Sequence, residues 1–211
     1  MTAGGISQAP ERPGVDGVDR VRMLGMSGRA QSFGTAAAAD GRLARRTVEA
    51  PWLPAGSDAE VWVGDIDSLP EPSIIVRLLL TRRSGPGPTR FFCVPSAKGL
   101  DLPTRFLDRD TERPDPSRGV ARLVTAVLGP GAVTTHCVGY VRNVVPVPDA
   151  DYPHPTPWAH VPVVVVDGAP EPAVDGEWVD LESARDQLST RHWWPIVEHH
   201  LEAAGQPAER P

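Results

Sequence analysis

The stretch of sequence that most constrains the fold is residues 115–130, Asp-Pro-Ser-Arg-Gly-Val-Ala-Arg-Leu-Val-Thr-Ala-Val-Leu-Gly-Pro. Asp115 can act as an N-cap, and Pro116 suits the first helical position because its missing N–H would be unpaired there. Apolar residues then recur at spacings of three and four: Val120, Leu123, Val124, Val127 and Leu128. Gly129-Pro130 is a common stop signal. The pattern predicts a helix over 116–128 with one apolar face.

Strands are predicted before this helix. Residues 60–65 have strand character, and the aliphatic run 73–80 has the length of a strand buried on both faces. A Gly/Pro turn at 84–88 precedes a further strand at 90–94, so we expect a hairpin over 73–94. A polar loop is expected over 95–115.

More strands and two short helices are predicted after it. Two β-rich segments cover 135–145 and 158–167, and Pro162 favours an edge position or a late start for the second. A short strand at 177–179 precedes a helix near 181–188 that Asp180 can cap. A last helix is expected over 192–204, with Trp193 and Trp194 packed on the sheet and one of them half exposed.

The composition indicates one domain with tails. The chain has 211 residues with 24 prolines and 20 glycines, which implies many loops. Residues 1–50 lack sustained periodicity, so we expect a disordered tail with a short helix in the stretch 35–47. The domain is expected over 51–205, followed by a short tail at 206–211.

Charge and cysteine content exclude several classes of protein. The net charge is −6, and the arginine richness fits a GC-rich genome, so we expect no nucleic-acid binding. Two cysteines are too few for a disulfide framework. No apolar run approaches 18 residues, and the N-terminus lacks the apolar region of a signal peptide. We therefore expect a cytoplasmic protein that does not span a membrane.

The order and spacing of these elements over residues 60–202 resemble the Nudix superfamily. That family's signature is G-x5-E-x7-R-E-U-x-E-E-x-G-U, where U is aliphatic, and it often follows Leu-Pro-Gly-Gly. When the signature is anchored on Gly129, its arginine and aliphatic positions fall on Arg122 and Val124, and Leu102-Pro103 lies several residues early. The resemblance implies an α/β fold in which an α/β/α sandwich surrounds a mixed β-sheet.

The glutamates of the signature are replaced. The metal-binding pair falls on Ala126 and Val127, the glutamate after the arginine on Leu123, the earlier glutamate on Pro114 and the opening glycine on Asp108. Family members attack a diphosphate with water while Mg²⁺ or Mn²⁺ neutralises the phosphate oxygens. Such ions need several oxygen ligands, which hydrocarbon side chains cannot supply. We therefore expect no cofactor, and Mg²⁺ or Mn²⁺ only if the chain is active.

Two groups of candidate site residues remain. Asp108 and Asp115 lie in the acidic loop 108–115 and could form a substitute metal site, although arginines interleave with the acidic residues and a solvated acidic loop is the simpler interpretation. His160 and Trp158 lie near the position where family members line their substrate pocket, and we predict that they bind ligand. Ordinary packing is the competing interpretation for both. No residue is predicted to be catalytic.

Three functions follow from these observations. The first is a weakly active or inactive Nudix-fold protein that binds a nucleotide-like small molecule or has a regulatory role. The second is an active metal-dependent Nudix hydrolase that uses the acidic loop. The third is an unrelated α/β interaction domain. A homodimer is left open.

Overall fold

A computed structural model of the chain describes residues 41–83, 85, 87–107, 115–168 and 171–205. Its larger sheet has six strands in the order β1 (Arg42–Thr47), β2 (Asp58–Ile66), β8 (Thr135–Val144), β9 (Trp158–Val166), β3 (Ile75–Leu79) and β7 (Thr104–Phe106). β3 and β9 run parallel, and the other neighbours are antiparallel. The sheet is therefore mixed.

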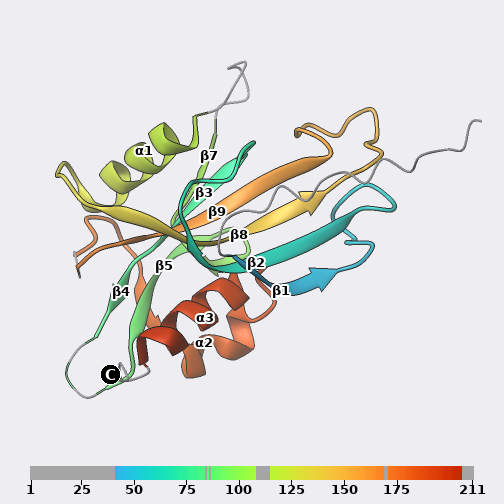
Figure 1. Cartoon of the computed structure of the whole chain (residues 1–211). Helices are drawn as coiled ribbons and strands as arrows, with labels where there is room; N and C mark the ends of the chain where they lie inside the picture. Colours follow the sequence, from blue (N-terminus) through green and yellow to red (C-terminus); the bar gives the residue numbers. More distant parts are fainter. Residues whose placement is uncertain (1–40, 84, 86, 108–114, 169–170, 206–211) are drawn as a thin grey trace, which may run out of the picture. The chain divides into compact units, whose positions relative to one another are not determined.

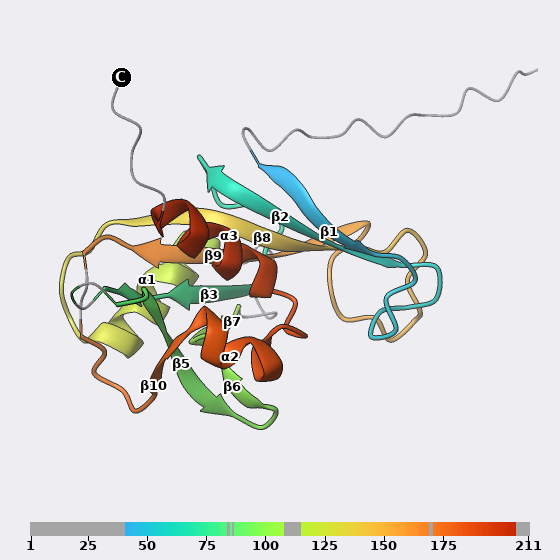
Figure 2. The ribbon, with the colours of Figure 1, turned by 90° about the horizontal axis from the view of Figure 1, so that it is seen from below.

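A second, smaller sheet consists of β10 (Glu177–Asp180), β5 (Arg90–Ser96) and β4 (Thr81–Arg82), and β6 (Gly99–Asp101) also pairs with β5. Because β4 follows β3 after a single residue, the chain passes directly from the larger sheet into the smaller one. Figure 2 shows β5, β6 and β10 beside the helix α2 (Leu181–Leu188).

Helices cover both faces of the larger sheet (Figure 1). α1 (Pro116–Leu128) packs on β3 and β7, whereas α3 (Trp194–Gly205) packs on β2 and β8. α2 (Leu181–Leu188) contacts β10 and β6. The expected α/β fold class, with a mixed sheet between helices, is confirmed. No helix among the described residues combines the length and apolarity needed to cross a membrane.

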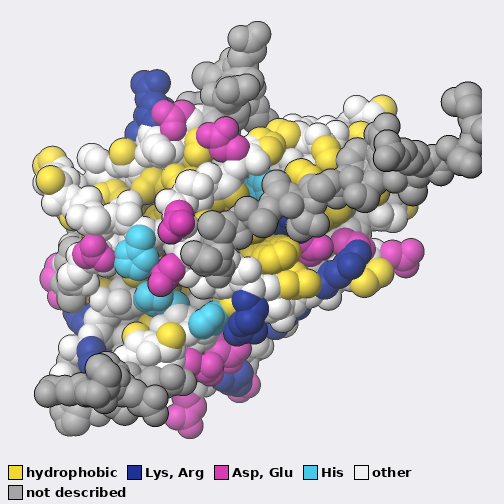
Figure 3. Space-filling model, viewed as in Figure 1, with side chains coloured by type: hydrophobic (Ala, Val, Ile, Leu, Met, Phe, Trp, Pro, Cys, Tyr) yellow, Lys and Arg dark blue, Asp and Glu magenta, His cyan; other side chains and the backbone are white. Residues whose placement is uncertain are grey.

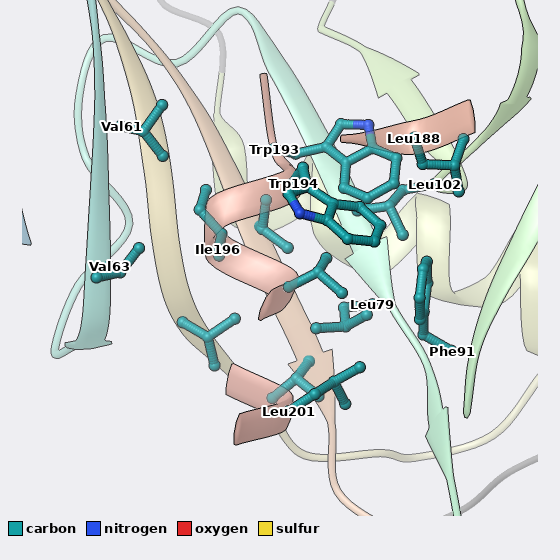
Figure 4. Close-up of a cluster of buried hydrophobic side chains, with 14 of the residues drawn as sticks. Val61, Val63, Leu79, Phe91, Leu102, Leu188, Trp193, Trp194, Ile196 and Leu201 are labelled. Atoms are coloured by element: carbon teal, nitrogen blue, oxygen red, sulfur yellow. The ribbon is translucent and has the colours of Figure 1, made fainter. Parts of the chain in front are cut away.

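The core has two parts because strand side chains alternate between faces. In β3, Val76 and Leu78 pack with α1, whereas Leu79 packs with α3. On the α3 side, Trp193 and Trp194 lie among Leu102, Leu188 and Phe91 (Figure 4). Both tryptophans are 1% exposed, so the expectation that one would be half exposed is wrong.

The sheet begins earlier than expected. Residues 42–47 form β1, which pairs with β2 from Arg42–Val63 to Thr47–Ala59. They therefore belong to the sheet although they precede residue 51, and the helix expected within 35–47 does not form over 42–47. The arginines and alanine of residues 42–47 suit a helix locally. Pairing with the edge of β2 instead gives the backbone N–H and C=O groups of this segment their hydrogen-bond partners.

Two strand predictions need correction. The hairpin over 73–94 is reduced to the short pairing of β4 with β5, because β3 pairs with β7 and β9 instead. Pro162 does not mark an edge, since β9 lies between β8 and β3. The β3–β9 ladder starts at Val163, after a bridge between Ser73 and His160, so Pro162 falls where no N–H is needed. The loop expected over 95–115 also contains β6 and β7.

The predicted helix 116–128 is confirmed at both ends. The Asp115 side chain accepts a hydrogen bond from the Arg118 N–H at 3.1 Å. Gly129 ends the helix with a φ of 81°, a backbone conformation that a glycine adopts without strain. The last helix starts at Trp194 rather than at residue 192.

Candidate functional site

The face of α1 on which the resemblance would place metal ligands is mostly closed. Leu123 is 4% exposed and Val127 is 5% exposed, and both pack against the larger sheet with Val76 and Leu78. Ala126 is exposed but has only a methyl group. None of these three side chains can offer an oxygen to a cation, so this face does not fit Mg²⁺ or Mn²⁺.

The acidic loop is only partly described. Asp108 lies outside the described residues, as do 109–114. Asp115 is exposed, and its Oδ1 accepts the N-cap hydrogen bond of α1. Among the described residues, no group of three or more His, Cys, Asp or Glu side chains is arranged to hold a metal ion. The assignment of Asp108 and Asp115 as ligands remains a prediction.

Trp158 and His160 belong to a group of side chains on the α1 side of the larger sheet, which we call the aromatic–arginine row: Glu60, Trp62, Tyr140, Arg142, Trp158 and His160. Cross-strand register brings them together, since Arg142 of β8 pairs with Glu60 of β2 and with His160 of β9. The row is therefore a product of strands that are far apart in sequence.

Arg142 lies at the centre of the row. Its Nε and Nη2 donate to Glu60 Oε2 at 2.9 and 2.6 Å. Its guanidinium also lies 5.0 Å from the Trp62 ring centroid and 5.7 Å from that of Trp158. Trp62 Nε1 donates to the same Glu60 oxygen at 3.1 Å. These contacts satisfy the charges of Arg142 and Glu60 within the protein.

His160 is integrated into the fold. It is 6% exposed, its ring packs edge-on to Tyr140, and its Nδ1 donates to the Pro72 carbonyl at 3.1 Å. Burial lowers the pKa of His160 to about 4, against a smaller opposing effect of the Pro72 hydrogen bond. The ring is therefore neutral at pH 7. Trp158 is partly exposed, and the ligand-binding role of the two residues remains a prediction.

A cavity of about 810 Å³ lies on the other side of the sheet, between the β5–β6 turn, β7 and the loop that joins α2 to α3. We call it the basic pocket and define it by six of its lining residues: Arg77, Lys98, Asp101, Phe106, Arg191 and His192. Its volume is within the usual range for small-molecule sites. The described lining has three permanent cations and one carboxylate.

Asp101 organises the basic pocket. Its Oδ1 accepts hydrogen bonds from Arg77 Nη1 at 2.5 Å, from Trp193 Nε1 at 2.7 Å and from the Leu102 N–H at 2.8 Å. Arg191 lies 3.7 Å from Asp101 Oδ2, and its Nη2 donates to the carbonyls of Lys98 and Leu100. One carboxylate therefore holds two guanidinium groups in place and leaves an excess of positive charge.

His192 forms part of the same wall. Its ring stacks on Trp52, from the loop between β1 and β2, with a centroid distance of 4.1 Å. Desolvation lowers the pKa of His192, and four nearby cations lower it further: Arg77, Lys98, Arg45 and Arg191. Phe106, which is 65% exposed, gives the cavity an apolar edge. The pocket thus combines positive charge with an exposed aromatic ring.

The basic pocket was not predicted from the sequence, although the sequence contains one signal for it. Arg77 interrupts the aliphatic run 73–80, and a charged residue in a buried strand requires a partner. That partner, Asp101, is 24 residues away and is identified only by the fold.

Histidines gather in another place, between β8 and α3. His136 lies 6.5 Å from His200 between ring centroids, and His136 Nδ1 is 3.3 Å from Asp167 Oδ1. Figure 3 shows histidine side chains beside acidic ones on this face. Desolvation and the proximity of His136 lower the pKa of His200. Among the described residues, these two histidines and Asp167 do not form a group of three that could hold a metal ion.

No family model and no curated protein matches the chain. Among solved structures, a Nudix hydrolase from M. smegmatis, RenU, is similar at a TM-score of 0.42 and 17% sequence identity, over 71% of this chain and 98% of that chain.

Proposed function

We propose that this chain is a Nudix-type protein that binds a small nucleotide-like anion in the basic pocket and has lost metal-dependent hydrolysis. The proposal joins two lines of support. The element order and the remains of the signature resemble the family, and the chemistry of the pocket suits an anion with an aromatic ring.

One observation carries the loss of hydrolysis. Leu123 and Val127 are 4% and 5% exposed on the face of α1 where the resemblance would require glutamates. A divalent ion there would meet hydrocarbon rather than carboxylate oxygen, and the charge that retains such an ion is missing. α1 therefore cannot hold the divalent ion that the family uses to activate water.

Positive charge supports the binding part of the proposal. Lys98 is exposed at the rim, while Arg77 and Arg191 are held by Asp101. Phosphate or carboxylate oxygens can accept hydrogen bonds from such groups, and an aromatic ring can pack on Phe106. Preorganised cations lose little freedom on binding, which favours affinity.

Isothermal titration with ADP in EDTA tests the proposal. We expect saturable one-to-one binding, weakened roughly tenfold by Lys98→Met because a charge-assisted hydrogen bond is lost. Arg118→Met removes a charge from the exposed face of α1 and is the matched control. It should leave binding unchanged. Absence of ADP binding would contradict the proposal, and loss of binding in Trp158→Ala but not in Lys98→Met would place the ligand on the aromatic–arginine row.

A further inference from the structure

The basic pocket contains a titratable side chain, His192, whose surroundings carry more positive than negative charge. His192 lies in the loop between α2 and α3, is solvent-exposed and lines the cavity. One face of its ring is covered by Trp52 at 4.1 Å. The ring is thus held at the wall of the cavity while the residue stays accessible to a ligand.

Among the described residues, cations outnumber carboxylates around His192. The nearby charged groups are Arg45 on β1, Arg77 on β3, Lys98 on the β5–β6 turn and Arg191 on its own loop. The carboxylate that faces the same cavity is Asp101 on β6, and it already accepts hydrogen bonds from Arg77, Trp193 and Leu102. Desolvation, the largest single cause, and these cations both lower the pKa of His192, so the charges around the pocket oppose a further positive charge on the ring.

A bound anion reverses this balance. Its negative charge offsets the cations, so that a protonated His192 becomes favourable, and the imidazolium can stay stacked on the electron-rich face of Trp52. Because linkage is reciprocal, a ligand that favours protonation is itself bound more tightly by the protonated protein.

We propose that anion binding in the basic pocket is coupled to protonation of His192, so that the protein binds its ligand more tightly at acidic pH and releases it as the pH rises. This inference rests on the proposed function and adds a mode of regulation to the same site. Trp52 acts as the positioning residue, since it fixes the plane of the imidazole at the wall of the cavity.

The test uses 4-nitrophenyl sulfate, an aromatic anion whose charge is constant between pH 5.5 and 8.0. We expect its affinity for the full chain to fall roughly fivefold over that range. His192→Gln should bind weakly at both pH values, and His192→Lys should restore tight binding at pH 8.0 because its charge is permanent. Trp52→Phe should keep the pH profile, whereas Trp52→Ala should flatten it.

A second measurement on the unchanged protein does not depend on variants. Calorimetric titration at pH 6.5 in two buffers of different ionisation enthalpy should reveal proton uptake on binding. Binding of the probe without proton uptake and without pH dependence would overturn the coupling and leave the proposed function standing. Absence of probe binding at every pH would overturn both.

Discussion

Ala126 and Val127 are consecutive residues of α1, yet Ala126 is exposed to solvent while Val127 is 5% exposed and packs on the sheet. The two positions that a metal-binding pair of glutamates would occupy therefore point in different directions, one to solvent and one into the core. This relationship makes the orientation of α1 directly testable by placing a carboxylate at each position.

Val127→Glu should lower the free energy of unfolding by roughly 3 kcal/mol or more, because it buries a carboxylate without a partner. Ala126→Glu is the matched control and should change stability by no more than about 0.5 kcal/mol, as is usual for surface substitutions. Urea unfolding followed by tryptophan fluorescence measures both. Equal effects of the two substitutions would show that α1 is rotated relative to this account.

Asp101→Asn should destabilise the fold by roughly 1–3 kcal/mol, because Arg77 and Arg191 lose the charge that balances them while Asp101 is only 18% exposed. The same change should weaken ADP binding, since Arg77 and Arg191 lose the carboxylate that holds them in place for the anion. Glu171→Gln is the control: Glu171 pairs with Arg82 but is 72% exposed, so its loss should be nearly neutral. Denaturant unfolding and ADP titration give the two readouts, and unchanged or tighter ADP binding by Asp101→Asn would contradict the role given to Asp101.

His160 should make stability depend on acid pH. Its pKa is lowered from 6.5 in the unfolded chain to about 4 in the fold, so the unfolded state binds more protons between these values. Its contribution, at most about 3 kcal/mol, is complete above pH 6.5 and is lost as the pH falls through 4. His160→Gln should flatten the stability profile between pH 6.5 and 4, measured by urea midpoints. An unchanged slope in this variant would mean that His160 titrates normally.

Asp115 separates a capping role from a metal-binding role. Asp115→Ala should destabilise the protein by about 1 kcal/mol, because the Arg118 N–H loses its acceptor. Asp115→Asn should keep nearly full stability, since asparagine caps equally well but is a poorer ligand for Mg²⁺. Thermal unfolding with and without Mg²⁺ checks this. A stabilisation by Mg²⁺ that Asp115→Asn abolishes would support the acidic-loop hypothesis instead.

Local patterns predicted the elements that depend on local physics. Asp115, Pro116 and Gly129 bounded α1, and Asp180 capped α2, because caps and stop signals act within a few residues. The expectations that failed depended on long-range pairing. β1 forms only because β2 offers an edge, and β3 pairs with β9, some 85 residues later, rather than with β5.

The candidate sites show the same difference between features set by local sequence and features set by long-range pairing. Trp158 and His160 were selected from the sequence, but their packing against Arg142 and Tyr140 results from the register of two strands, β8 and β9. The basic pocket joins Arg77, Asp101 and Arg191 from three distant segments, and no spacing in the sequence indicates it. The aliphatic replacements at Leu123 and Val127 could be recognised in advance because helical periodicity fixes the buried face of α1.

Calorimetric titration of the protein with Mg²⁺ and Mn²⁺, combined with an assay for phosphate products from nucleoside-diphosphate conjugates, tests the central claim most directly. We expect no metal binding by the protein in the micromolar range and no turnover. Micromolar binding of either ion together with release of phosphate products would contradict this expectation.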